Sequence, residues 1–177
     1  AEGMDFEEQA FDIPFPLARF QALSPDGAIL YALQEPTSEV DAGEESEVTG
    51  SSAPANATAV VSDLLVIHMG GKSGPQQVAR VSLTLQGSPT GLKLGPLGQL
   101  VVLQERQLTV CDTTNPLAPT PVAQLVLAAA TPKRELIDAE FVGNGRQLVV
   151  LEAFANQAHL IDLQVPSQPR LISSIAL

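Results

Sequence analysis

The sequence predicts an all-β fold made of three consecutive repeats, and three observations support this prediction. A turn that contains glycine leads into a β-branched or leucine-rich run three times along the chain. Each repeat then adds two further short apolar runs in the same order. Glycine and proline interrupt these runs too often for helices, with 13 glycines and 14 prolines among 177 residues.

The four strands expected in each repeat follow one another directly. The leading strands are expected over residues 17–23, 90–94 and 136–142. The second strands follow the turns Ser24-Pro-Asp-Gly, Gly95-Pro-Leu-Gly and Gly143-Asn-Gly. The third strands are Leu65-Val-Ile-His-Met, Thr109-Val-Cys-Asp and His159-Leu-Ile-Asp, and the fourth begin at Val78, Val122 and Ile172.

One position near the end of each third strand relates the repeats. His68, Asp112 and Asp162 each lie ten residues before the start of the fourth strand. The spacings between them, 44 and 50 residues, match the size of a four-stranded β-propeller blade. We therefore expect three four-stranded antiparallel blades of a β-propeller. Because a propeller closes with at least about four blades, the ring is partial or is completed by another chain.

The acidic residues divide the chain unevenly. Thirteen of the twenty acids lie in residues 1–63, where Arg19 is the only base. The expected parts are an acidic and aromatic N-terminal arm (1–16), blade 1 (17–85), blade 2 (86–127) and blade 3 (128–177). Blade 1 carries an acidic insertion over residues 35–62, which we expect to be solvated and to lie outside the blade.

Composition narrows the partners and the location. The net charge of −11 and the absence of a basic cluster argue against nucleic-acid binding. No apolar run is long enough to span a membrane. The chain begins with Ala1 rather than Met, as does a mature protein that has lost its signal peptide, although a shortened chain would begin the same way. An extracytoplasmic location (periplasmic, cell-surface or secreted) is therefore expected. Cys111, the only cysteine, is expected to be a small core residue.

No motif predicts a catalytic, cofactor-binding or metal-binding residue. Gly70-Gly-Lys72-Ser73-Gly lacks the first glycine of a phosphate loop and precedes a strand, which favours a hairpin loop. His68 and His159, the only histidines, have no partners at metal-ligand spacing. Acids between Asp41 and Glu47 are able to gather around calcium, but without the EF-hand pattern a solvated loop is favoured. Asp112 and Asp162 are expected to cap the turns that follow them.

The third and fourth strands resemble a known bacterial repeat. Leu108-Thr-Val-Cys-Asp112-Thr-Thr-Asn115-Pro116 is similar to the LVIVD-type propeller repeat, and Leu160-Ile-Asp162 begins a looser copy. Ser24-Pro-Asp-Gly27 resembles the opening turn of YVTN-type and WD40-like blades. The first repeat departs from the pattern with His68 in place of Asp. The resemblance covers about residues 17–177 and implies a propeller, in families that are mostly binding surfaces and include few enzymes.

Two functions stay open at this point. The favoured one is a non-catalytic interaction or scaffold module of a bacterial envelope or secreted assembly, which binds a protein partner or further copies of itself. The alternative is a propeller domain or subunit of a periplasmic enzyme, of the lactonase-like or quinoprotein type. The expected interface residues lie at the two ends of the chain: Phe6, Phe11, Ile13, Phe15, Leu171, Ile172, Ile175 and Leu177.

Overall fold

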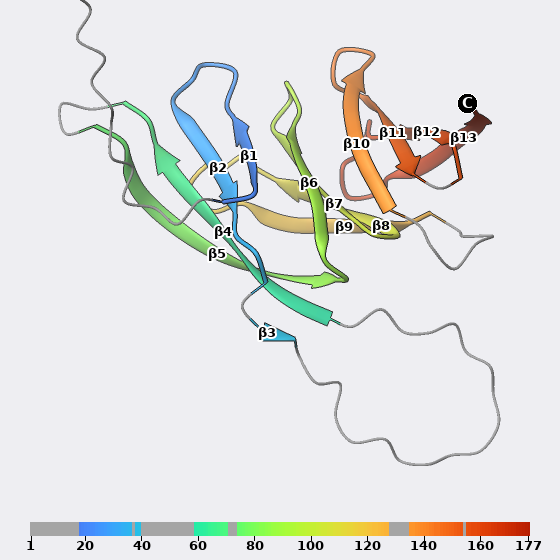
Figure 1. Cartoon of the computed structure of the whole chain (residues 1–177). Helices are drawn as coiled ribbons and strands as arrows, with labels where there is room; N and C mark the ends of the chain where they lie inside the picture. The colour runs from blue at the N-terminus through green and yellow to red at the C-terminus, as the bar shows by residue number, and fades with distance from the viewer. Residues whose placement is uncertain (1–17, 37, 40–58, 71–73, 128–134, 154) are drawn as a thin grey trace, which may run out of the picture.

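The structure, a computed structural model, describes residues 18–36, 38–39, 59–70, 74–127, 135–153 and 155–177. These residues form 13 β-strands and no helix. The strands make three antiparallel sheets (Figure 1). The predicted all-β class and the three four-stranded blades are therefore confirmed.

Each blade is built on four antiparallel strands, each of which pairs with the next of the four. Blade 1 contains β1 (Phe20–Leu23), β2 (Ile29–Leu33), β4 (Ala59–His68) and β5 (Gln76–Gln86). Blade 2 contains β6 (Pro89–Leu94), β7 (Gln99–Gln104), β8 (Gln107–Asp112) and β9 (Thr120–Val126). Blade 3 contains β10 (Glu135–Val142), β11 (Gln147–Ala153), β12 (Gln157–Asp162) and β13 (Arg170–Ala176).

The register of the strands is the same in all three blades. His68, Asp112 and Asp162 end their third strands and pair with Gln76, Thr120 and Arg170. A β-bulge follows at the same place in each fourth strand and leaves one residue without a partner: Val78, Val122 or Ile172. This common register confirms the alignment of the repeats that the ten-residue spacing predicted.

Two apolar cores join the blades face to face, which is how blades pack around a propeller axis. Between blades 1 and 2 the core includes Tyr31, Leu33, Leu64, Val66, Leu100, Val102 and Cys111. Between blades 2 and 3 it includes Val101, Leu103, Leu108, Val110, Leu148, Val150 and Ile161. Figure 1 shows the leading strands β1, β6 and β10 side by side.

Left-handed glycines close the turns between the first and second strands. Gly27 and Gly145 occupy equivalent turn positions with φ of +72° and +81°, a conformation that disfavours side chains. The two sites differ in their surroundings. A Cβ at Gly27 would meet nothing within 4 Å, whereas a Cβ at Gly145 would lie 2.6 Å from Cγ of Pro96 in blade 2.

Blade 1 extends further than the sequence predicted. Its third strand begins at Ala59, inside the segment 35–62 that was expected to lie outside the blade. Residues Ala59–Ser62 pair with β5, and β3 (Ser38–Glu39) pairs with the same part of β4. The reason is burial: Val60 belongs to the core between blades 1 and 2. The insertion outside the sheet is therefore shorter than expected, and residues 40–58 lie outside the described part of the chain.

Candidate functional site

The loops that follow the third strands are held by carboxylates. Oδ1 of Asp112 accepts the N–H of Thr114 at 2.8 Å and its hydroxyl at 2.6 Å. These bonds, the hydroxyl first, lower the pKa of Asp112. Oδ1 of Asp162 accepts the N–H of Gln164 at 2.8 Å. Both carboxylates lie at one register position, and each fixes the first residues of its loop.

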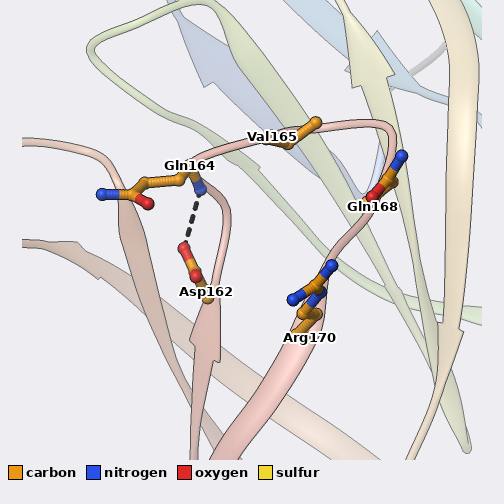
Figure 2. A pocket seen from close by; sticks show the side chains of 5 residues that line it. All are labelled: Asp162, Gln164, Val165, Gln168 and Arg170. Atoms are coloured by element: carbon orange, nitrogen blue, oxygen red, sulfur yellow. Dashed lines mark hydrogen bonds between the residues drawn. The ribbon is translucent and has the colours of Figure 1, made fainter.

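Two small hollows lie beside these loops. The first, of about 130 Å³, is lined by Asp162, Gln164, Val165, Gln168 and Arg170. Figure 2 shows the Asp162 and Arg170 side chains on adjacent strands below the loop that carries the other three residues. The second, of about 280 Å³, lies between Asp112, Thr114 and Val122 of blade 2 and Pro166 and Ser167 of blade 3. Both are smaller than the roughly 300–1,000 Å³ of sites that enclose organic ligands.

A cluster of a buried acid, a buried imidazole and an exposed hydroxyl joins three strands of blade 3. Nε2 of His159 lies 2.7 Å from Oε2 of Glu152, and Nδ1 lies 2.8 Å from Oγ of Ser174. The His159 and Glu152 side chains are 4% exposed or less. In Ser-His-Asp hydrolases the serine faces Nε2 and the acid faces Nδ1, so the order of partners here is reversed.

The same positions in blade 2 also hold polar side chains. Gln104 corresponds to Glu152 and Thr109 to His159, and Nε2 of Gln104 donates to Oγ1 of Thr109 at 2.8 Å. A polar cluster at this place is therefore a repeated feature of these two blades. The sequence did not reveal it, because Glu152 and His159 lie on different strands and only the register relates them. The repeat alignment, extended to the second strands, is the signal that would have found it.

The remaining candidate groups offer little chemistry. Burial raises the pKa of the Cys111 thiol to about 12, so this cysteine stays protonated. Among the described residues no three His, Cys, Asp or Glu side chains are placed to hold a metal ion. Lys72, Ser73 and the acids between Asp41 and Glu47 lie outside the described residues. The described residues also include no helix with the length and hydropathy to cross a membrane.

The face of blade 3 that points away from blade 2 is apolar and uncovered. Leu148 and Val150 pack against blade 2, so the alternating neighbours in β11 point to the other side. We call this side the open face; its apolar residues are Val149, Leu151, Leu160, Ile175 and Leu177. Figure 1 shows β13 and the C-terminus at this free side of the array.

A comparison with blade 2 shows what the open face lacks. The residues of blade 2 that correspond to Val149, Leu151 and Leu160 are completely buried by blade 3: Val101, Leu103 and Val110. Leu127 is 1% exposed in blade 2, whereas its counterpart Leu177 is 73% exposed. Ile175 is 60% exposed, while its counterpart Leu125 packs in the core between blades 2 and 3.

The expected interface residues divide into three groups. Ile175 and Leu177 lie on the open face. Leu171 pairs with Ile161 near blade 2, and Ile172 is the bulged residue; both are exposed. Phe6, Phe11, Ile13 and Phe15 lie outside the described residues. The sequence missed the second- and third-strand residues of the open face, because their runs read the same as the buried runs of blade 2.

Comparison with known proteins adds information on the fold. No protein-family model matches the sequence, and no curated protein matches it. A proposed 6-phosphogluconolactonase from Bacteroides fragilis superposes with a TM-score of 0.58 at 12% identity, over 89% of this chain and 43% of that one. A hypothetical selenium-binding protein from Sulfolobus tokodaii gives 0.57 at 9% identity, over 88% and 40%. A protein of unknown function from Desulfotomaculum acetoxidans gives 0.53 at 10% identity, over 89% and 56%.

The described chain spans between 40% and 56% of the length of these three structures. At 12% identity or less, such similarity is evidence of fold and not of activity. The chain therefore has the fold of three adjacent blades of a β-propeller.

Proposed function

We propose that this chain is a non-catalytic interaction or scaffold module that holds a protein partner against the open face of blade 3. The single observation behind the proposal is the exposure of Ile175 and Leu177, at 60% and 73%, whereas their counterparts in blade 2 are partly buried (Leu125) and fully buried (Leu127). Full burial of one such side chain is worth about 1.5–3 kcal/mol. A partner that covers the face gains this contribution at several positions at once.

Further parts of the proposal come from the sequence. The repeats belong to the LVIVD and YVTN type, and the module works outside the cytoplasm in a bacterial envelope or secreted assembly. The N-terminal arm, with Phe6, Phe11, Ile13 and Phe15, is a second segment that docks on a neighbour. An exposed apolar patch such as the open face commonly marks an interface.

The alternative function is a propeller domain or subunit of a periplasmic enzyme, lactonase-like or quinoprotein in type. Two observations favour it. One structural neighbour is a proposed 6-phosphogluconolactonase, and the Glu152–His159–Ser174 cluster links an acid, an imidazole and a hydroxyl. The cluster bridges three strands of one blade, and its polar counterpart in blade 2 holds no imidazole, so a structural role is favoured.

Light scattering and dye binding on the isolated 177-residue chain test the favoured function. We expect concentration-dependent association and strong binding of anilinonaphthalene sulfonate. The double variant Ile175→Asp, Leu177→Asp is expected to abolish both while keeping the β-sheet circular dichroism signal. Val126→Asp is the matched control, because Val126 is 65% exposed on the outer strand of blade 2, away from the open face.

Two sets of results would contradict the proposed function. A wild-type chain that stays monomeric, keeps its β-sheet signal at high dilution and binds no dye would contradict an obligate partner. Hydrolysis of a lactone by the wild-type chain, lost in both Ser174→Ala and His159→Gln variants that remain folded, would favour the enzyme instead.

A further inference from the structure

We propose that the occupant of the open face is a further four-stranded propeller blade that carries a lysine or arginine opposite Glu140. This inference rests on the proposed function and names the partner of the same surface. It follows from the repeat register, from the apolar match between blades, from one inter-blade ion pair and from the burial of blade 1.

The register shows which residues the occupant must meet. Val149 in blade 3 corresponds to Val101 in blade 2, because each lies two residues after the glutamine that pairs with Asp162 or Asp112. In blade 2 the face that contains Val101 is covered by the next four-stranded blade in the chain. The open face of blade 3 is the equivalent face, at the place where the next blade would pack.

The faces with which blades 2 and 3 contact the preceding blade indicate what kind of surface fits the open face. Blade 2 meets blade 1 with Leu92, Leu100 and Val102. Blade 3 meets blade 2 with the corresponding residues Ala139, Leu148 and Val150. At both junctions in this molecule, an aliphatic sheet face therefore covers the preceding blade. The open face of blade 3 is aliphatic at the positions where blade 2 is covered in this way.

The ion pair between blades 2 and 3 indicates which charge the occupant of the open face must carry. Nζ of Lys93 in β6 lies 2.8 Å from Oδ1 of Asp138 in β10. Lys93 pairs with Val101 in its own sheet, and Glu140 pairs with Val149, so Glu140 is the counterpart of Lys93. Glu140 is exposed and makes no ion pair among the described residues. At the position where blade 3 offers Asp138 to Lys93, the occupant must offer a cation to Glu140.

A second copy of this chain fits less well. Its blade 1 would have to present the face that contains Ala32, Leu65 and Ile67, the counterparts of the blade 2 residues that cover blade 1. These side chains are already 3% exposed or less within the chain. At the counterpart of Asp138, blade 1 carries Phe20, which has no charge.

The size of the structural neighbours agrees with a further blade. The chain covers 43% of the Bacteroides fragilis protein and 40% of the Sulfolobus tokodaii protein. Propellers have about four to eight blades, so three blades leave room for more.

A tandem chain provides the test: residues 128–177 are repeated after Leu177, so that a fourth blade of known sequence follows the open face. With the native sequence, Glu140 would face the second copy of Asp138, and the two like charges would repel. In this tandem chain Glu140→Lys recreates the Lys93–Asp138 pairing. We expect the appended blade to fold, and Glu140→Lys in the first copy to raise the folding equilibrium of that blade about two- to fivefold.

Controls make the charge effect specific. Glu140→Lys in the parent chain is expected to leave the urea midpoint unchanged, and the gain in the tandem chain is expected to shrink in 0.5 M salt. Two results would overturn the inference: hydrogen exchange of the appended blade at unfolded-chain rates, or an equal effect of Glu140→Lys in both chains. Failure of the proposed function looks different, since the parent chain would then bind no dye.

Discussion

At the residue scale, the carboxylate of Asp63 ties β4 to β5. It accepts hydrogen bonds from Nε of Arg80 at 2.8 Å and from Oγ of Ser82 at 2.7 Å. These bonds, that from Arg80 first, lower the pKa of Asp63. Because the folded-state pKa lies below the unfolded value of about 3.9, the contribution is present above that pH and is lost as the pH falls through the folded-state pKa.

Asp63→Asn is therefore expected to lower the free energy of unfolding by about 1–3 kcal/mol at pH 7. The free energy of unfolding of the variant should also fall less than that of the wild type as the pH decreases from 5 through the folded-state pKa of Asp63. Urea unfolding at neutral and acid pH measures both effects. Glu105→Gln, in an exposed turn, is the control, and an equal loss in the two variants would contradict a specific role for Asp63.

The two left-handed glycines offer a second prediction at this scale. Gly27→Ala introduces only backbone strain and should cost about 1–2 kcal/mol. Gly145→Ala adds a clash with Pro96 across the junction of blades 2 and 3, where overpacking costs about 1–3 kcal/mol more. Urea midpoints of the two variants measure the difference. Equal midpoints would mean that the junction relaxes without cost.

At the element scale, the long third strand of blade 1 predicts different effects for two deletions in the acidic insertion. Replacement of residues 40–58 by a short Gly/Ser linker should change the free energy of unfolding by less than about 1 kcal/mol, because closure entropy varies slowly with loop length. Removal of residues 35–62 also takes Val60 and Ser62 from β4, both buried. The loss of Val60 alone should cost about 1.5–3 kcal/mol. Thermal unfolding distinguishes the two, and equal midpoints would show that Ala59–Ser62 is dispensable.

At the scale of the whole molecule, blade 2 is covered on both faces and blade 3 on one. Local opening should therefore be easier in blade 3, as in the terminal repeats of stacked arrays. We expect amide hydrogens in β11 and β12 to exchange at least about tenfold faster than their counterparts in β7 and β8. Val150 and Val102 are a matched pair, since both point toward the preceding blade. Equal protection would imply that the open face does not limit stability.

How far the sequence predicts this molecule depends on the scale of the contact. Turns and short apolar runs are local, so the repeats, the blades and the equivalence of His68, Asp112 and Asp162 could be read from spacing alone. The start of β4 at Ala59 could not, because Val60 is buried by blade 2, which lies far along the chain. The pairing of Glu152 with His159 depends on register between strands. The open face was visible only at Ile175 and Leu177, where the apolar run ends.

The fourth strand of each blade consists of two half-strands of opposite phase, joined at the bulged residue. In blade 3, regular pairing onward from Arg170 would place Ser173 opposite His159 and Ser174 opposite Ala158. Ile172 absorbs this offset, so that Ser174 meets the imidazole and Ile175 stays opposite Ala158 on the open face. One added residue thus decides which side chains in the outer half of the strand reach the open face. A change that straightened β13 would invert that half and put Ser174 in place of Ile175 opposite Ala158 on the open face, without altering a single side chain.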